Sequence, residues 1–155
     1  MGVDVYGNAP TTEQGEYFRN NVWAWRPLAD YIIDTSPQIA AGCCSWFTND
    51  GEGLNAKDST ALADALQAEI DAGHTESYAK IRDAEIAAMP NMPCRICGGT
   101  GRRLPSPDVG PGELPCNGCD ETGSVRPWDS HYPFWVENVQ GFVTFLRGCG
   151  GFKIW

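Results

Sequence analysis

The most regular hydrophobic pattern in the chain predicts a helix that begins at Ser59. Leu62, Leu66 and Ile70 recur at four-residue intervals, which places their side chains on one face of a helix. Ser59 is suited to cap the first turn, because its hydroxyl can accept a hydrogen bond from a free backbone amide. Gly73 is suited to end the helix.

A second helix is predicted directly after the first. Thr75 can cap it, and Tyr78, Ile81 and Ala88 would face inward before Pro90 stops the helix. We expect the two segments to form a helical hairpin.

The apolar positions between residues 13 and 25 fit two patterns. Phe18, Val22 and Trp25 lie at i, i+4 and i+7 spacing, which suits the buried face of a helix. Trp23 and Trp25 also alternate, as they would in a strand. We predict a helix over 13–25 and keep the strand as the alternative.

Two further apolar runs predict elements nearer the ends of the chain. A short helix is expected over 27–34, where a proline suits its first position. A longer helix over 133–146 is expected to end at Gly148. Its inward face comprises Val136, Val139, Phe142, Val143 and Leu146. A strand over 152–155 should follow and pair with residues 3–6.

Four of the seven cysteines form two Cys-x-x-Cys pairs, which are the strongest chemical signal in the sequence. Cys94 and Cys97 form the first pair, and Cys116 and Cys119 form the second. Each pair brings two sulfurs to one side of a tight turn, so that two such turns complete a tetrahedral set of thiolates for one structural Zn²⁺. A redox motif is less favoured, because it would need a thioredoxin-like strand and helix around the cysteines. An iron–sulfur cluster is also less favoured, because the linker between the two pairs is long and hydrophilic.

The residues around these pairs resemble the DnaJ-type cysteine-rich zinc finger. Cys94 to Gly101 matches its repeat, Cys-x-x-Cys-x-Gly-x-Gly, and Cys116 to Gly123 matches it with Glu121 in place of the first glycine. DnaJ proteins have four repeats and two zinc sites, whereas this chain has two repeats and lacks the His-Pro-Asp tripeptide of a J-domain. The resemblance therefore implies one zinc site and no co-chaperone activity. The chain is also similar to a small uncharacterised family of bacterial and phage proteins in the segments MGVDVYG, YFRNNVWAWRPL, NDGEGL and ENVQGFVTFLRGCGGFKIW.

These elements predict one small α+β domain over 1–155. It should contain several helices, a short sheet and a protruding four-cysteine zinc hairpin inserted at 91–127. The chain has 155 residues, is 42% apolar and holds six tryptophans, which is enough to build one core. No segment reaches the roughly 18 apolar residues of a membrane span, and the first residues lack the basic and apolar regions of a signal peptide. We expect a soluble, cytoplasmic protein.

The net charge of −9 is concentrated before the cysteine pairs. Residues 1–90 carry 14 acidic and five basic side chains, whereas residues 91–155 carry six of each. This acidity opposes contact with nucleic-acid phosphates and favours a protein partner with a basic surface. The candidate acidic contacts on the predicted hairpin are Asp58, Asp64, Asp71, Glu76, Asp83 and Glu85. The aromatic candidates are Trp23, Trp25 and Trp46.

The remaining polar residues give weaker signals. Residues 49–53 resemble part of a calcium loop but lack its first and twelfth acidic ligands, so a glycine turn is the favoured interpretation. The cysteines outside the pairs are expected to be buried apolar thiols: Cys43, Cys44 and Cys149. The side chains available for a catalytic site would be Asp50, Glu52, His74, His131 and Cys43.

Among functional classes, the sequence favours a non-enzymatic, zinc-stabilised acidic binding protein. If it is encoded by a phage, such a protein would inhibit a host machine that handles nucleic acid or serves defence, by occupying a basic groove. The alternatives are a zinc-finger module that contacts nucleic acid through Arg95, Arg102, Arg103 and Arg126, and an enzyme with an unrecognised site. No membrane partner is expected.

Overall fold

The computed structural model describes residues 2–103 and 114–155, which fall into two compact units. The first, called the main unit, joins the residues up to Ala84 with Tyr132–Trp155. The second, called the cysteine unit, comprises Glu85–His131 and contains both cysteine pairs. Helices and small antiparallel sheets make up the described chain, so the predicted α+β class is confirmed. No helix among the described residues is long and apolar enough to cross a bilayer.

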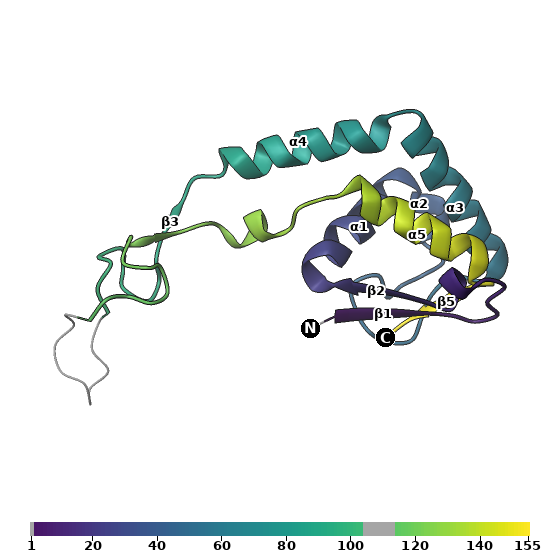
Figure 1. Cartoon of the computed structure of the whole chain (residues 1–155), viewed down its shortest axis with the longest axis horizontal. Helices are drawn as coiled ribbons and strands as arrows, with labels where there is room; N and C mark the ends of the chain where they lie inside the picture. Colours follow the sequence, from purple (N-terminus) through teal and green to yellow (C-terminus); the bar gives the residue numbers. More distant parts are fainter. Residues whose placement is uncertain (1, 104–113) are drawn as a thin grey trace. The chain divides into compact units, whose positions relative to one another are not determined.

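A three-stranded antiparallel sheet connects the two ends of the main unit. Strands β1 (Gly2–Gly7), β2 (Tyr17–Asn21) and β5 (Phe152–Ile154) lie in the order β2-β1-β5 (Figure 1). Val5 pairs with Ile154, so the predicted pairing of the last strand with the first is confirmed. The helices α1, α3 and α5 lie on one side of this sheet (Figure 1).

The glycine turn predicted over 49–53 runs beside β5. The Phe152 amide donates to the Leu54 carbonyl, and the Ile154 amide donates to the Glu52 carbonyl, each at 2.9 Å. A Cβ on Gly53 would lie 1.9 Å from the Phe152 carbonyl oxygen, so only glycine permits this approach. The glycines of this segment therefore serve close backbone packing.

The helix predicted over 13–25 is wrong. The chain forms a short 3₁₀ turn, η1 (Glu13–Gly15), then β2, and the helix α1 (Val22–Thr35) begins only at residue 22. Asn21 sets this boundary, because its Oδ1 accepts the Ala24 amide at 2.9 Å as an N-cap. The helix predicted over 27–34 exists within α1 but starts five residues earlier. The short helix α2 (Pro37–Ala40) follows it.

The caps predicted for the next two helices are also wrong. Asn55 caps α3 (Ala56–Asp71) by accepting the Asp58 amide at 2.9 Å. Ser59 is a buried residue inside α3, and its hydroxyl lacks a partner within the described chain. The helix α4 (His74–Ala88) begins one residue before Thr75, whose buried hydroxyl instead meets the Tyr31 hydroxyl at 2.9 Å.

The predicted helical hairpin does not form. α3 packs mainly along α5 (Val136–Gly148), and α4 is not among its principal neighbours in the described structure. Of the three α4 residues predicted to face inward, Tyr78 packs against Tyr31 and Phe134, whereas Ile81 is 60% exposed and Ala88 is exposed. Because α5 covers the apolar face of α3, that face is not available to α4.

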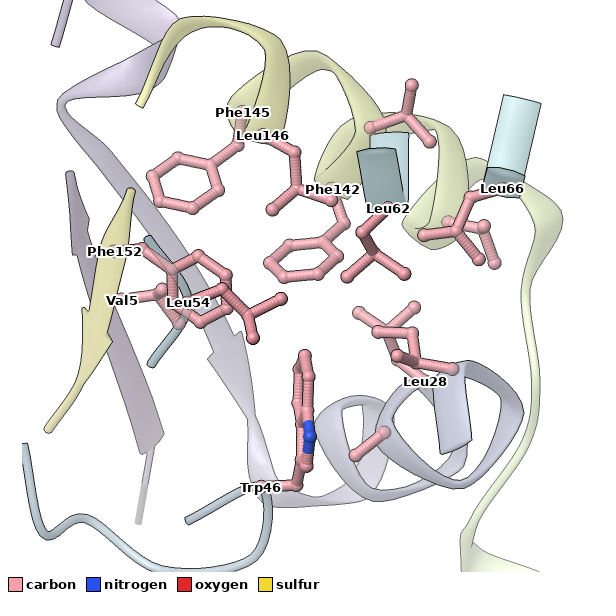
Figure 2. Packing of buried hydrophobic residues seen from close by; sticks show 14 of the residues in the cluster. Val5, Leu28, Trp46, Leu54, Leu62, Leu66, Phe142, Phe145, Leu146 and Phe152 are labelled. Atoms are coloured by element: carbon pink, nitrogen blue, oxygen red, sulfur yellow. The ribbon is translucent and has the colours of Figure 1, made fainter. Parts of the chain in front are cut away.

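The core of the main unit is built around α5, whose apolar face matches the prediction except that Val136 is only partly buried. Phe142 is fully buried and meets Trp25 edge-on, with ring centroids 5.7 Å apart. Figure 2 shows its ring between Leu62 of α3 and Phe152 of β5. The N-terminal and C-terminal segments thus share one hydrophobic core.

Candidate metal centre

Two tight turns hold the four paired cysteines in the cysteine unit. A two-stranded sheet of β3 (Met92–Pro93) and β4 (Ser124–Val125) brackets both turns. A bridge between Arg102 and Pro115 joins the turns at their far ends. All four cysteines are buried, at 0–7% exposure, in a cluster separate from the main core: Cys94, Cys97, Cys116 and Cys119.

Each turn directs a backbone amide at one of its own sulfurs. Gly101 donates to the Cys97 Sγ at 3.3 Å, and Gly123 donates to the Cys119 Sγ at 3.3 Å. The turns also bond to each other, because the Cys94 amide donates to the Gly123 carbonyl at 2.8 Å. These amides favour the thiolate form of the sulfurs that accept from them.

The glycines of the repeat are required by close backbone contacts. Gly101 has φ +75°, and a Cβ there would lie 2.2 Å from the Glu121 carbonyl oxygen. Gly123 has φ +74°, and a Cβ there would lie 2.2 Å from the Gly99 carbonyl oxygen. Glu121 occupies the place that Gly99 has in the first turn, and it adopts φ +64° at a cost of about 1 kcal/mol.

The four sulfurs form one compact group. All lie within 4.8 Å of one another, and no other group of potential ligands this close occurs in the parts of the chain that the structure describes. Cys94 and Cys116 are 3.9 Å apart at Sγ, and Cys97 and Cys119 are 3.8 Å apart. These separations are far beyond the ~2.05 Å of a disulfide bond. The cluster could hold one metal ion.

The four thiols of the cluster do not ionise equally. At Cys97, burial opposes ionisation, but the amides of Gly101 and Gly99, together with hydrogen bonds from neighbouring cysteines, lower the pKa to about 6. At Cys119, burial and the neighbouring thiols raise the pKa to about 12 despite the amide of Gly123. Four adjacent thiolates are therefore incompatible unless a cation lies among them. At neutral pH a bound metal must displace the Cys119 proton, so metal binding weakens as the pH falls.

The three remaining cysteines differ from one another. Cys43 and Cys149 are buried as predicted, and burial raises the pKa of each thiol. Cys44 is exposed, which corrects the prediction that it is buried. Cys44 lies at a bend of the chain, and its side chain stays at the surface while that of Cys43 enters the core.

Thiol counting should distinguish these classes of cysteine. In the metal-loaded native protein we expect one thiol, Cys44, to react rapidly with Ellman's reagent. After a chelator removes the metal ion, the four cluster thiols should react as well. Cys43 should stay protected, because it is a buried thiol of raised pKa. A rapid reaction of Cys43 or Cys149 in the native protein would contradict this assignment.

The residues considered for catalysis do not form one constellation. The Glu52 carboxylate accepts the Cys44 amide at 3.3 Å, and Asp50 accepts the Thr48 hydroxyl. The structure pairs His74 with Glu69, at 3.0 Å from Nδ1 to Oε2, away from that turn. His131 belongs to the cysteine unit, in the 3₁₀ turn η2 (Trp128–His131).

Two of the three tryptophans considered for partner binding are core residues. Trp25 and Trp46 are 2% and 3% exposed, which removes them as surface candidates. Each indole finds a backbone acceptor: Trp25 Nε1 donates to the Trp46 carbonyl at 2.6 Å, and Trp46 Nε1 donates to the Ala40 carbonyl at 2.9 Å. Trp23 is half-buried and packs against Tyr132 with ring centroids 5.0 Å apart.

The six candidate carboxylates lie on α3 and α4, which do not form the expected hairpin face. Asp58 contacts Asn55, Asp64 contacts Arg147, Asp71 contacts Gln67 and Glu76 contacts Lys80, and Glu85 has an interaction as well. Asp83 and Glu85 are exposed farther along α4. Most of these carboxylates thus support their own helices or a neighbouring one.

The arginines of the cysteine unit are mostly engaged as well. Arg126 donates to the Ile86 and Met89 carbonyls at 2.6 and 3.1 Å, which satisfies acceptors at the end of α4. Arg103 donates to the Asn117 side chain. Arg95 has no partner among the described residues and remains available.

A groove beside the four clustered cysteines is a feature that the sequence did not predict. It has a volume of about 520 Å³ and lies entirely within the cysteine unit. Three exposed apolar side chains line it: Met92 at 43%, Ile96 at 55% and Trp128 at 65% exposure. The signal for it in the sequence is Ile96, an apolar residue between Cys94 and Cys97 in a tight turn.

Comparisons of the chain with protein-family models, with curated proteins and with solved structures found no match. The likeness to the DnaJ-type finger therefore remains a resemblance carried by the two cysteine repeats.

Proposed function

We propose that the protein is a non-enzymatic binding protein, in which one structural zinc ion organises the cysteine unit to dock an extended segment of a partner protein. The groove beside the cysteines is the observation that carries this proposal. Exposed apolar side chains gathered on a small unit are typical of a protein-interaction site.

The dimensions of the cluster support zinc as its ion. A regular tetrahedron of sulfurs at the usual Zn–S distance of about 2.3 Å has edges of about 3.8 Å. The Sγ separations of 3.9 Å for Cys94–Cys116 and 3.8 Å for Cys97–Cys119 fit this length. A polynuclear iron–sulfur cluster would have to enclose inorganic sulfide, for which sulfurs within 4.8 Å leave no room. Four thiolates also leave no open coordination position, which favours a structural ion.

The zinc site determines the shape of the groove. Ile96 lies between the ligands Cys94 and Cys97, and its side chain crosses to the second turn, where a Cβ on Gly118 would be 2.4 Å from the Ile96 Cδ1. The groove wall therefore requires both turns to be held together. Because the ion holds them, we expect docking to depend on zinc.

The lining of the groove defines the chemistry of the docked segment. Apolar side chains form its walls, and the guanidinium of Arg95, which has no partner among the described residues, belongs to the lining. An extended peptide with an apolar side chain and a nearby carboxylate complements this surface. The basic partner expected from the acidic first half remains a separate prediction, because it concerns α3 and α4.

The proposal can be tested with a phage-displayed library of random 12-residue peptides. The zinc-loaded protein should enrich peptides that combine an apolar and an acidic residue. Ile96→Ala should lower the affinity for the enriched peptide about tenfold, because truncating a central apolar contact removes about 1 kcal/mol or more of binding free energy. Ile81→Ala is the matched control, since Ile81 is 60% exposed on α4 and does not line the groove.

Two results would refute docking in this groove. One is the absence of any enriched peptide for the zinc-loaded protein. The other is an equal loss of binding in Ile81→Ala and Ile96→Ala at unchanged zinc content.

A further inference from the structure

The outer face of the three-stranded sheet in the main unit carries aromatic and cationic side chains. Strand alternation sends Val3 and Val5 to the core, and Phe152 and Ile154 likewise face inward. The alternate residues face outward: Asp4, Tyr6, Tyr17, Arg19, Lys153 and Trp155. The helices cover only the opposite side of the sheet (Figure 1).

The strand register arranges these six residues in two rows of three. Tyr6 on the central strand lies opposite Tyr17 on one side and Lys153 on the other. In the next row, Asp4 lies opposite Arg19 and exchanges two backbone hydrogen bonds with Trp155, at 2.9 and 2.7 Å. Neighbours within a row are about 4.8 Å apart, and the rows are about 7 Å apart.

The three rings are held in place while remaining open to solvent. Tyr6, Tyr17 and Trp155 are 48%, 41% and 51% exposed. Tyr6 and Tyr17 pack against each other with centroids 5.0 Å apart. Trp155 lies over the backbone of Gly51, where a Cβ would be 2.5 Å from the indole ring. A ring fixed on one side and exposed on the other is suited to stacking.

The six residues of this face include two cationic side chains and one carboxylate, whereas the protein as a whole has a net charge of −9. Arg19 and Lys153 occupy diagonally opposite corners of the two rows. Asp4, the carboxylate of the set, accepts the Tyr17 hydroxyl and lies 3.7 Å from Arg19. The Arg19 side chain is still 70% exposed, so it retains donors for an external anion.

We propose that this sheet face binds a short single-stranded nucleic acid. Bases stack on Tyr6, Tyr17 and Trp155, and backbone phosphates contact Arg19 and Lys153. The paired rings select an unpaired strand, because the bases of a duplex are not accessible for stacking. Because the rest of the chain is acidic, it repels the phosphates of a longer strand, and the contact is limited to a few nucleotides. This surface is distinct from the groove of the cysteine unit, so either proposal can fail alone.

Fluorescence anisotropy with labelled ten-nucleotide oligothymidine, oligouridine and a ten-base-pair duplex tests the proposal. Both single strands should bind, and the duplex should not. With two phosphate contacts, the plot of log K against log salt should have a slope of about −1.4. Lys153→Ala should reduce this slope to about −0.7.

Aromatic substitutions separate stacking from fold stability. Tyr6→Ala should weaken binding about five- to one-hundred-fold, whereas Tyr6→Phe keeps the ring and should bind like the parent protein. Thermal unfolding of each variant verifies that the sheet remains folded.

Three outcomes would overturn the proposal. The first is equal binding by Tyr6→Ala and Tyr6→Phe, and the second is preference for the duplex. The third is self-association that Tyr6→Ala abolishes, which would make this face an interface between two copies of the chain.

Discussion

Replacing Cys97 by serine is expected to release the metal and unfold the cysteine unit while the main unit stays folded. Structural zinc sites contribute about 10–16 kcal/mol of apparent binding free energy, and the turns around this cluster have little other core. The main unit has its own hydrophobic cluster and should not depend on the ion. Zinc content per chain, limited proteolysis and near-ultraviolet circular dichroism together measure this outcome.

The tryptophans make this experiment selective. Only Trp128 lies in the cysteine unit, whereas the other five belong to the main unit, so the near-ultraviolet signal reports mainly on the latter. Cys44→Ser is the matched control, because Cys44 is an exposed thiol outside the cluster. Full zinc retention in Cys97→Ser, or a general loss of the tryptophan signal, would show that the two units are not organised in this way.

Replacing Phe142 by alanine is expected to produce the opposite pattern. Phe142 is fully buried and contacts rings from three other elements: Phe18, Trp25 and Phe152. Removing such a side chain lowers the free energy of unfolding by about 3–5 kcal/mol, a large share of the 5–15 kcal/mol typical of a domain. The Tm of the main unit should fall by at least about 10 °C while zinc content stays at the parental level.

An exposed substitution provides the control for Phe142→Ala. Ile81→Ala removes an apolar side chain that is 60% exposed, so it should change the free energy of unfolding by no more than about 0.5 kcal/mol. If both variants unfolded at similar temperatures, Phe142 would not be the centre of the core shown in Figure 2.

The cysteine cluster and the C-terminal elements could be predicted because their signals are local or strongly periodic. Two cysteines separated by two residues must share one turn, whatever surrounds them. The helix that ends at Gly148 and the strand that follows it have apolar positions that fit one period each. The pairing of this strand with β1 could be predicted because its apolar residues Phe152 and Ile154 are expected to be buried in the core.

The region from residue 13 to residue 25 shows why periodicity can mislead. Phe18 faces the core from a strand and Trp25 faces it from a helix, so their helical spacing arises from two different elements. The boundary between them depends on Asn21, whose capping bond is a single side-chain contact. A helix over 13–25 would not bring Tyr17 and Arg19 opposite Tyr6 and Asp4, as β2 does.

The tryptophans and the acidic helices depended on tertiary contacts that one sequence does not reveal. The burial of Trp25 and Trp46 requires carbonyl acceptors for their indoles, and these come from Trp46 and Ala40. The α3–α4 hairpin failed because α5, far away in the sequence, covers the apolar face of α3. Sequence patterns identify apolar faces, but they do not determine which element covers each face.

X-ray absorption spectroscopy at the zinc edge, combined with metal analysis of the purified protein, tests the metal centre most directly. One zinc per chain with four sulfur neighbours at about 2.3 Å is the predicted result. Iron in place of zinc, two zinc ions per chain, or a first shell with nitrogen or oxygen ligands would contradict a single site formed by Cys94, Cys97, Cys116 and Cys119.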